Sequence, residues 1–292
     1  MATRGGADPM QLATQRILLT GAGGGIGRLV ARRLVEKGAR LCALEYSPDA
    51  ADALRAELQP LGTPPLVALG DVTRAASRAA AIALAQREWG GIDILINLAG
   101  LLDLCRFEES DPATVARLLA VNLEAPMLLT REVLPGMLQR GHGRIVNVGS
   151  MFGSIAFPLF ASYSASKFAL RGFSQALRRE LAGTGVGVTY IAPRAVRTAL
   201  NPPVVHAMAA QGLMRMDEPE PVVAAMIRAI ERERNEVYLG RPEGFFARVN
   251  AVLPGLVDGA LAGQLPALLA HLHGTSGARG TTPARQPQEQ SA

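Results

Sequence analysis

Short apolar runs alternate with longer stretches in which apolar residues recur every three or four positions, from residue 16 to about residue 240. Short runs of this kind are typical of buried strands, and the three- and four-residue spacing is typical of amphipathic helices. Strands are expected at Arg16–Thr20, Arg40–Glu45, Leu66–Leu69, Ile92–Asn97, Arg144–Val148, Val186–Ile191 and Glu236–Leu239. Helices are expected at Ile26–Lys37, Asp49–Leu58, Arg74–Trp89, Pro112–Arg140, Ser162–Leu181 and Pro219–Glu233. This order predicts an α/β fold with one doubly wound, Rossmann-type parallel sheet of about seven strands and helices on both faces.

The flanking segments differ from this central pattern. Residues 1–15 are mostly polar and are expected to form a flexible N-terminal segment, which leaves residues 16–240 as the domain that carries the Rossmann-type sheet. Residues 241–273 form an apolar C-terminal extension. Residues 274–292 contain no large apolar side chain to offset the entropy cost of ordering them, which predicts a disordered tail.

Composition disfavours several function classes. The net charge is +5, but the basic residues are dispersed and no cationic run carries interleaved aromatic residues, so nucleic acid binding is not expected. The first residues lack the apolar core of a secretory signal, which favours a cytoplasmic location. Cys42 and Cys105 are expected to be free thiols, and the four histidines form no cluster with metal-ligand spacing, so no catalytic metal is expected.

A glycine-rich run lies between the first expected strand and the first expected helix. It reads Thr20-Gly21-Ala22-Gly23-Gly24-Gly25-Ile26-Gly27. Glycine in this position permits a tight turn and a close approach of the backbone to a pyrophosphate, and the free N–H groups of the following helix attract anions. Flexible loops also collect glycine, but the place of this run between strand and helix predicts a dinucleotide site.

Residues after the next three strands fit the same crevice. Glu45 ends the second strand, at the spacing from which a carboxylate binds ribose hydroxyls and repels a 2′-phosphate, so NAD(H) is favoured and NADP(H) remains possible. A solvated charge at a strand end is the alternative. Asp71 and Val72 follow the third strand, where Asp71 is available to the adenine amino group, and Asn97 opens a segment through Gly100 after the fourth. Both segments could instead be turns or helix caps.

Tyr163 and Lys167 are four residues apart in a helical stretch, so they share one face about 6 Å apart along the axis. An ammonium stabilises a neighbouring phenolate, so Lys167 is expected to lower the pKa of Tyr163 and is also placed to hold a nicotinamide ribose. Only Lys37 and Lys167 are lysines among 30 basic residues, which indicates that a compact ammonium is needed at position 167. Chance pairing of an aromatic and a cation on a helix is the alternative.

Two further polar residues lie near the expected strand ends. Ser150 follows the fifth strand, where its hydroxyl could donate to a substrate carbonyl as negative charge develops. Asn122 lies within the long helix before that strand, where its amide could order a water near Lys167 or stabilise helix packing.

Taken together, these motifs resemble the classical short-chain dehydrogenase/reductase family. The resemblance spans roughly Arg16 to Leu239 and rests on Thr20-Gly-x-x-x-Gly25-x-Gly27, Asn97-x-Ala99-Gly100, Asn122, Ser150, Tyr163-x-x-x-Lys167 and Pro193 through Thr198, in that order. It implies an NAD(P)-dependent oxidoreductase that interconverts a secondary alcohol and a ketone by direct hydride transfer at nicotinamide C4.

The resemblance also implies roles for single residues. Tyr163 would be the general acid for reduction and, as phenolate, the base for oxidation; Ser150 would polarise the carbonyl, Lys167 would lower the tyrosine pKa and bind the ribose, and Asn122 would hold a proton-relay water. The nucleotide would contact Gly21, Gly25, Ile26, Gly27, Glu45, Asp71, Val72, Asn97, Ala99, Gly100, Tyr163, Lys167, Pro193, Val196 and Thr198. Thr198 would contact the nicotinamide carboxamide or a phosphate.

Two positions depart from the family pattern. Leu98 stands where a second asparagine is usual, and Arg194 stands where glycine usually follows Pro193. Arg194 could recognise an anionic group such as a phosphate or carboxylate, but a side chain that faces solvent is favoured slightly. Gly24 occupies the loop position at which NADP(H)-preferring relatives carry a basic residue.

The segments expected around the substrate are apolar. Met151–Phe160 and the stretch after Thr198 carry Phe and Met residues, which suits a hydrophobic, lipid-like or steroid-like ketone or alcohol, although ordinary core packing would give the same composition. In Phe245–His273, the charges of Arg248 and Asp258 and the breaks at Pro254 and Pro266 argue against one continuous transmembrane helix. The segment is expected to close over the substrate, pack against another subunit or contact a membrane surface, in that order. Family members are commonly homodimers or homotetramers, which the apolar helix faces here allow.

Two alternative functions share the fold. A non-catalytic dinucleotide-sensing or scaffold protein would keep the glycine loop, but a complete set of polar residues for catalysis favours an enzyme. A sugar-nucleotide epimerase or dehydratase is less favoured, because those relatives usually have a differently spaced glycine loop and a larger substrate domain. The sequence does not specify the substrate, the physiological direction or the stereochemistry.

Overall fold

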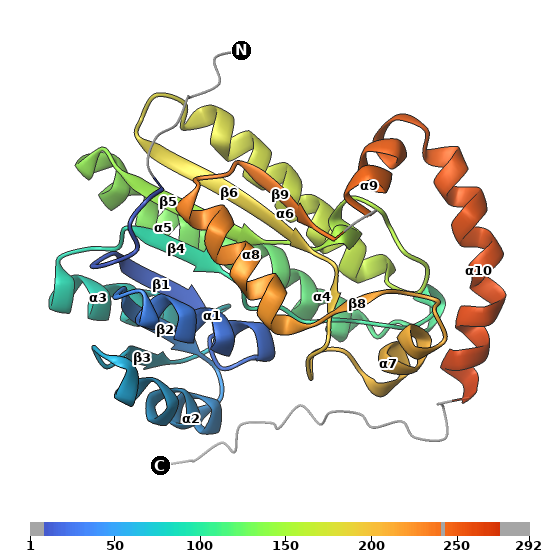
Figure 1. The fold of residues 1–292 in the computed structure, drawn as a ribbon, viewed down its shortest axis with the longest axis horizontal. Helices are drawn as coiled ribbons and strands as arrows, with labels where there is room; N and C mark the ends of the chain where they lie inside the picture. Colours follow the sequence, from blue (N-terminus) through green and yellow to red (C-terminus); the bar gives the residue numbers. More distant parts are fainter. Residues whose placement is uncertain (1–8, 241–242, 275–292) are drawn as a thin grey trace.

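Seven parallel strands form the central sheet of the protein in a computed structural model, which describes residues 9–240 and 243–274 (Figure 1). The strand order is β3-β2-β1-β4-β5-β6-β9. The strands are β1 (Arg16–Thr20), β2 (Arg40–Glu45), β3 (Leu66–Leu69), β4 (Ile94–Asn97), β5 (Gly143–Val148), β6 (Val186–Pro193) and β9 (Glu236–Leu239). The order reverses direction between β1 and β4, and a ligand crevice is expected where the strand order reverses. The predicted α/β fold is thus confirmed.

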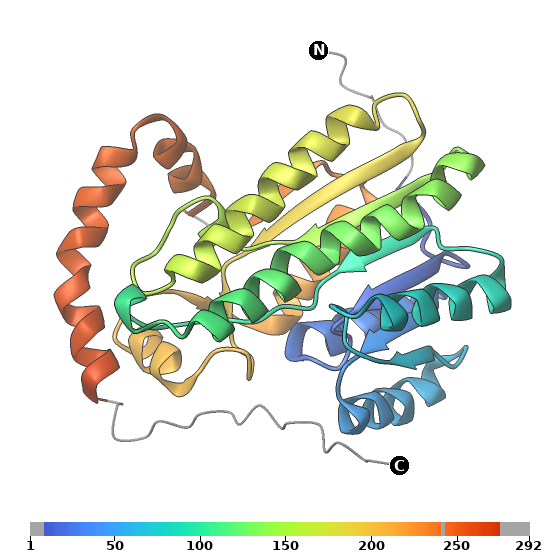
Figure 2. The ribbon, with the colours of Figure 1, turned by 180° about the vertical axis from the view of Figure 1, so that it is seen from behind.

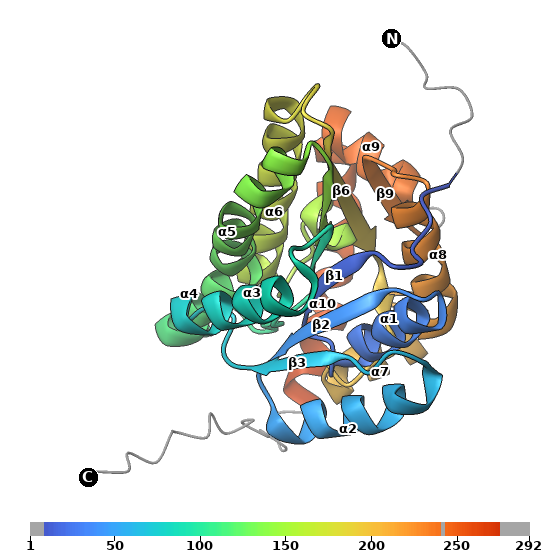
Figure 3. The same cartoon turned by 90° about the vertical axis from the view of Figure 1, so that its left-hand side faces the viewer.

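Helices cover both faces of the sheet, as Figure 3 shows. The main helices are α1 (Gly25–Glu36), α2 (Pro48–Leu58), α3 (Ala75–Trp89), α4 (Pro112–Leu119), α5 (Ala125–Arg140), α6 (Ala161–Glu180) and α8 (Pro219–Glu231). Helices α1, α2 and α8 pack on one face and bury one apolar cluster, whereas α3, α5 and α6 bury a second cluster on the other face. Figure 2 shows the long helices α5 (green) and α6 (yellow-green) side by side over the sheet.

The long helical stretch Pro112–Arg140 contains a feature that periodicity did not predict. A π-helical turn, η3 (Ala120–Glu124), separates α4 from α5 and carries the buried Asn122. Such single wide turns are frequent at functional sites. Short 3-10 turns occur at Gln59–Leu61 (η1), Phe107–Glu109 (η2) and Met151–Gly153 (η4).

The part of the chain beyond β6 holds most of the elements that the sequence did not predict. Here β7 (Ala195–Val196) pairs with β8 (Met216–Asp217), and α7 (Pro203–Ala210) lies between them. After β9 come α9 (Glu243–Val252) and α10 (Pro254–Gly274), and α10 stands at one end of the molecule beside α7 (Figure 1).

Two prolines behave differently in the C-terminal segment. The helix does end before Pro254, and the chain bends by 118° between α9 and α10. Pro266 was predicted to break the helix as well, which is wrong, because α10 continues through it. Leu268, fully buried against the α7 region, anchors the helix just beyond this proline.

The N-terminal boundary also differs from the prediction. Part of the segment expected to be flexible is packed: Leu12 is buried in the core, the Met10 N–H donates to the Glu231 carbonyl at 2.7 Å, and the Thr14 N–H donates to the Gly38 carbonyl at 2.8 Å. Burial of the Leu12 side chain offsets the entropy cost of ordering this segment. The polar composition had suggested that this entropy cost would keep the segment flexible. The predicted disordered tail lies outside the described residues, apart from Gly274.

Two described segments have the length and apolar composition of a membrane-crossing helix. One is Pro112–Arg140, and the other is the bent pair Gly244–Val252 and Pro254–Leu272 taken together. The first is a core helix, since Leu129, Val133 and Met137 on α5 are buried against the sheet.

Candidate active site

The turn from β1 to α1 is a cradle built from glycine. Gly21 has a φ of +71°, and a Cβ there would lie 2.8 Å from the Ala99 Cα. A Cβ on Gly27 would lie 1.9 Å from the Gly21 carbonyl oxygen. These positions therefore require glycine, and the N-cap Gly24 leaves the amino end of α1 without a side-chain cap. An open helix amino end of this kind fits the diphosphate of a dinucleotide.

The loop after β6 closes against this cradle. A Cβ on Gly25 would lie 2.8 Å from the Thr198 Cβ, so glycine allows the loop to approach the amino end of α1. Pro193, Val196 and Thr198 all line the same cleft, as does Ile26. The residues predicted on both sides of the nucleotide are thus brought together.

Glu45 is tied to the glycine loop from the end of β2. Its carboxylate accepts hydrogen bonds from the backbone N–H groups of Gly23 at 2.8 Å, Tyr46 at 3.0 Å and Ser47 at 3.2 Å. The carboxylate lies on the cleft wall and is largely buried. The Glu45 carboxylate is therefore not a free surface charge. Besides being placed to contact a nucleotide, it fixes the shape of the glycine loop.

Asp71 and Val72 line the cleft beside Glu45. Asp71 accepts hydrogen bonds from the Thr73 N–H and hydroxyl at 2.9 and 2.8 Å and pairs with Arg117 at 2.8 Å. Burial alone would raise the pKa of Asp71, but the Thr73 and Arg117 contacts outweigh it and lower this pKa. Asp71 is therefore an ionised hydrogen-bond acceptor at the cleft edge.

Asn97 differs from the prediction. Its side chain is buried and does not line the cleft; it donates to Asn147 at 2.8 Å and to Thr130 at 3.4 Å, behind the cleft floor. Ala99 and Gly100 do line the cleft. The Thr20 hydroxyl accepts hydrogen bonds from the backbone of the turn after β4, which joins the ends of β1 and β4. Asn97 is thus a residue of the sheet rather than of the cleft wall.

Ser150, Tyr163 and Lys167 converge at the carboxyl end of β5, where all three line the cleft. The Ser150 side chain lies close enough to the Tyr163 hydroxyl to lower the pKa of this tyrosine. The Lys167 Nζ lies 5.7 Å from the centre of the Tyr163 ring and donates to the Val148 carbonyl at 3.2 Å. The one-face arrangement predicted from the four-residue spacing is therefore present.

The electrostatics of this group differ from the prediction. Burial raises the pKa of Tyr163, and the nearby Ser150 side chain only partly offsets this effect. Burial also lowers the pKa of Lys167 to about 8. The expected lowering of the tyrosine pKa by Lys167 is thus not produced by the protein groups alone, because desolvation of both side chains dominates.

Asn122 holds the wall beside Lys167 and does not itself line the cleft. Its Oδ1 accepts from the Leu101 N–H at 2.8 Å, and its Nδ2 donates to the Leu101 carbonyl at 2.9 Å and to the Ser166 hydroxyl at 3.1 Å. A Cβ on Gly100 would lie 3.4 Å from Asn122 Oδ1 and 3.6 Å from Lys167 Nζ. The side chain therefore makes packing contacts, and the proton-relay water at Asn122 stays a prediction.

The cleft continues from these polar groups into an apolar chamber. Its total volume is about 1510 Å³, above the range of roughly 300–1,000 Å³ for a single small-ligand site. Phe152 stacks on Phe157 with ring centres 5.1 Å apart, and its ring meets the Tyr163 ring edge-on at 6.2 Å. The cleft has room for a dinucleotide at the glycine loop and an apolar molecule beside Tyr163.

Sequence reasoning missed many of the residues that close this chamber. They come from α9 and α10 and include Phe246, Val249, Leu256, Val257, Leu261 and Gln264, whereas Leu213 and Met214 were expected in the stretch after Thr198. The only signal was the apolar composition of Phe245–His273 and of the stretch after Thr198. Of the three placements considered for the C-terminal segment, closure over the chamber is the one that this lining bears out.

Arg194, the substitution after Pro193, is neither solvent-facing nor unpaired. It lines the cleft and forms a two-point ion pair with Asp217, with Nε 3.1 Å from one carboxylate oxygen. Asp217 lies on β8, so this pair joins the two ends of the loop that carries α7. The preference for a solvent-facing side chain was wrong, because a buried guanidinium requires a partner.

Within residues 9–240 and 243–274, no group of three or more His, Cys, Asp or Glu side chains could hold a metal ion. Cys42 and Cys105 are both free, and Cys42 is buried.

Comparison with known proteins supports the resemblance to the short-chain dehydrogenase/reductase family. Residues 15–209 match the family model described as short chain dehydrogenase. The chain is 32% identical to the ketoacyl reductase HetN of Nostoc sp. over 231 residues, which is 79% of this chain and 80% of that protein. It is 38% identical to the D-threitol dehydrogenase of Mycolicibacterium smegmatis over 63% of this chain and 71% of that protein. It is 35% identical to the D-beta-hydroxybutyrate dehydrogenase of Cupriavidus necator over 66% and 74%.

Proposed function

This chain belongs to the short-chain dehydrogenase/reductase family and is an NAD(P)-dependent oxidoreductase, and on that premise we propose that Tyr163 is its general acid and base for interconverting a secondary alcohol and a ketone. The observation that carries the proposal is the position of the Tyr163 hydroxyl. It lies beside the Ser150 side chain, one helical turn from Lys167, and shares a cleft with the glycine loop.

The protein groups suggest how a ketone would be reduced. The Ser150 and Tyr163 hydroxyls would both donate to the carbonyl oxygen, and the Tyr163 proton would pass to that oxygen as it gains negative charge. Because burial raises the pKa of Tyr163, this residue is a neutral phenol near pH 7, which is the form that reduction requires. When bound, the nicotinamide nucleotide supplies or accepts the hydride at the substrate carbon.

In the reverse direction Tyr163 would take the alcohol proton, and the same raised pKa would make oxidation faster at alkaline pH. We assign Lys167 to the nicotinamide ribose and to stabilising the Tyr163 phenolate, and Asn122 to keeping the wall beside Lys167 in place. The backbone of Asn122 lies in a wide π-helical turn, which supports the predicted proton-relay water at this place.

We propose NAD(H) as the preferred nucleotide. The Glu45 carboxylate supports this preference, because it lies on the cleft wall at the end of β2 and would repel a 2′-phosphate. Gly21, Gly25, Ile26 and Gly27 would hold the diphosphate end, with Asp71, Val72, Ala99, Gly100, Pro193, Val196 and Thr198 along the rest of the cleft wall.

We further propose a hydrophobic substrate. The chamber beside Tyr163 is lined by Phe152, Phe157 and Phe160 and is closed by α9 and α10, which supports an apolar ketone or alcohol over a sugar. Exposed Phe245 at the start of α9 and Leu253 at the bend between α9 and α10 leave membrane-surface contact as a further prediction. The homodimer or homotetramer and the cytoplasmic location also stay predictions.

A panel assay tests this function. The purified chain is mixed with NADH or NADPH and a series of aliphatic and aromatic ketones, and the loss of reduced-nucleotide absorbance is followed. We expect turnover with at least one apolar ketone and a loss of about 100-fold or more in kcat for Tyr163→Phe and Ser150→Ala. Tight nucleotide binding without turnover of any ketone or alcohol would instead favour a dinucleotide sensor.

A further inference from the structure

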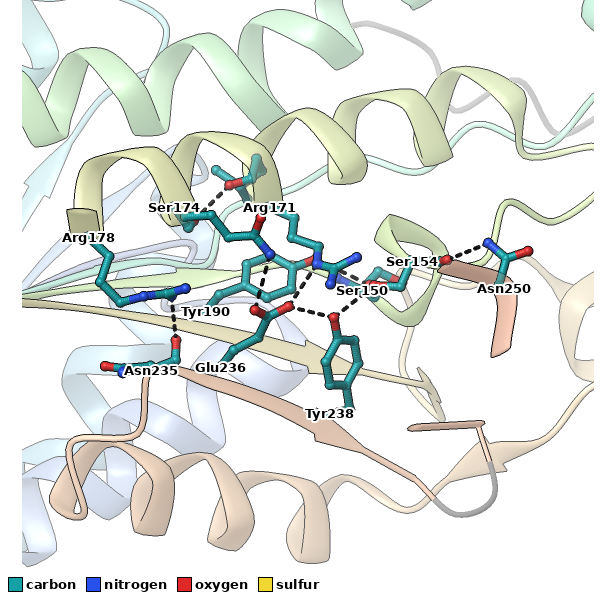
Figure 4. Close-up of polar contacts among 12 residues, drawn as sticks. Ser150, Ser154, Arg171, Ser174, Arg178, Tyr190, Asn235, Glu236, Tyr238 and Asn250 are labelled. Carbon is teal, nitrogen blue, oxygen red and sulfur yellow. Dashed lines mark hydrogen bonds and ion pairs between the residues drawn. The ribbon is translucent and has the colours of Figure 1, made fainter. Parts of the chain in front are cut away.

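The phenol of Tyr190 lies beside the backbone of Ser150 (Figure 4). Tyr190 is on β6 and fully buried. Its hydroxyl donates to the Ser150 carbonyl oxygen at 3.3 Å and accepts, more weakly, from the Ser150 N–H at 3.5 Å. One side chain thus contacts both backbone groups of the residue that we assign to polarising the substrate carbonyl.

The turn after β5 is shaped around this hydroxyl. The last backbone bond of β5 to β6 runs from the Gly149 N–H to the Ile191 carbonyl at 2.8 Å, and the chain then leaves the sheet. A Cβ on Gly149 would lie 2.1 Å from the Tyr190 hydroxyl oxygen, and a Cβ on Gly153 would lie 2.6 Å from it. Both glycines therefore make room for the phenol. Ser150 lies beyond the last backbone bond to β6, and the Tyr190 hydroxyl takes the place of a strand partner for its backbone.

The far end of the same turn is held by a second tyrosine. The Ser154 hydroxyl donates to the Tyr238 hydroxyl at 3.2 Å, and Tyr238 in turn donates to Glu236 at 2.5 Å. Asn250, on α9, donates to the Ser154 carbonyl at 2.9 Å. Figure 4 shows Tyr190 and Tyr238 approaching the turn from two neighbouring strands.

The helix that carries Tyr163 is locked to the same group. Lys167, Arg171 and Gln175 are spaced four residues apart on α6, so they lie on one face. Arg171 Nε donates to Glu236 at 2.7 Å, and Gln175 Nε2 donates to the other carboxylate oxygen at 3.2 Å. The Ser150 turn and the Tyr163 helix are thus fixed to the same pair of strands.

We propose that Tyr190 is a positioning residue that holds the Ser150 hydroxyl in line with the Tyr163 hydroxyl through its contacts with the Ser150 backbone. This inference rests on the function proposed above. Burial raises the pKa of Tyr190, so its hydroxyl keeps its proton and remains a donor to the Ser150 carbonyl at every working pH. The Glu236 and Tyr238 contacts hold the other end of the turn and the catalytic helix in the same frame.

Tyr190→Phe tests the inference because it removes only the hydroxyl and leaves the ring in place. Thr189→Val is the matched control: Thr189 is the next residue on β6, is fully buried, and its hydroxyl accepts from Arg144 at 2.8 Å on the opposite face of the sheet. Both variants are made in the wild-type chain and in a Ser150→Ala chain. Thermal unfolding, nucleotide affinity, kcat, KM and the pH profile are measured for each.

We expect Tyr190→Phe to lower kcat about fivefold to tenfold, as loss of one hydrogen bond would, with nucleotide affinity unchanged. The pH profile for alcohol oxidation should shift to higher pH, because the Ser150 side chain lowers the pKa of Tyr163 and would be held less firmly beside it. In the Ser150→Ala chain the same change should cost less than about twofold, since residues that act through one another are not additive. Thr189→Val should leave kcat and the pH profile unchanged.

An unchanged kcat in Tyr190→Phe, or an equal loss in the Ser150→Ala chain, overturns the inference and leaves the proposed function intact. Unchanged activity in Ser150→Ala and Tyr163→Phe themselves overturns both. Should Tyr190→Phe fail to fold, Tyr238→Phe releases the other end of the turn and is read by the same criteria.

Discussion

Replacing Lys167 by methionine should make the protein more stable while it inactivates the enzyme. Lys167 is almost fully buried, and burial lowers its pKa from an ordinary 10.5 to about 8. Each tenfold change in proton affinity is worth about 1.4 kcal/mol, so the buried ammonium costs about 3 kcal/mol at neutral pH. Removing it also leaves the Val148 carbonyl without its 3.2 Å donor, which costs about 1 kcal/mol. The net gain is about 2 kcal/mol.

The pH dependence gives this prediction its sharpest test. Because the folded pKa is lower than the unfolded pKa, the penalty is complete below about pH 8 and disappears as the pH rises toward 10.5. Urea unfolding of wild type and Lys167→Met without nucleotide should therefore show a stability gap that closes over this window. Lys37→Met is the matched control, since Lys37 is an exposed lysine that pairs with Glu231 at 2.7 Å, and its loss should cost at most about 1 kcal/mol at any pH. A Lys167→Met chain less stable than wild type near neutral pH, or a gap independent of pH, would refute the reasoning.

Four other outcomes are expected. Glu45→Gln should raise the affinity for NADPH relative to NADH by about tenfold in fluorescence titrations, because it removes the charge that repels a 2′-phosphate; an unchanged ratio would count against the assignment. Gly27→Ala should weaken nucleotide binding by about 100-fold or more, since its Cβ would lie 1.9 Å from the Gly21 carbonyl oxygen, and calorimetric titration would measure it. Phe246→Ser should raise KM for bulky apolar substrates about threefold to tenfold and leave small ones unaffected, which steady-state kinetics would show. Because burial raises the pKa of Tyr163, ketone reduction should stay constant through neutral pH while alcohol oxidation rises with pH; parallel profiles would exclude Tyr163 as the titrating group.

The sheet could be predicted closely because its strands are buried. The bounds of β1, β2, β3 and β9 agree with the expected ranges, and those of the other three differ by at most two residues. Strands covered on both faces appear as short apolar runs, which are separated clearly from amphipathic helices. The glycine loop was equally clear, since glycine there reflects backbone approach that no other residue permits.

Side-chain direction and electrostatic balance could not be read in the same way. Asn97 ends a strand where a cleft residue is expected, but its side chain turns to Asn147 inside the sheet. The Tyr163 and Lys167 spacing was correct, but whether attraction or desolvation dominates depends on how deeply both groups are buried. Tyr190 appeared in the sequence only as an apolar strand residue, and its contact with Ser150 depends on the packing of β5 against β6.

The C-terminal elements were recognised only by composition. The apolar residues of α9 and α10 indicated burial against some surface, but not which one. Their placement over the chamber depends on long-range packing, such as that of Leu268 near α7, which no local pattern encodes.

Isotope transfer tests the central claim most directly. A ketone that the wild type reduces is incubated with NADH carrying deuterium at both hydrogen positions of nicotinamide C4, and the alcohol is analysed by mass spectrometry for wild type and Tyr163→Phe. We expect one deuterium at the carbinol carbon of the wild-type product and a rate lower by about 100-fold or more in the variant, with equal nucleotide affinity. Equal rates in the two proteins, or an alcohol without deuterium, would contradict proton transfer from Tyr163 coupled to direct hydride transfer.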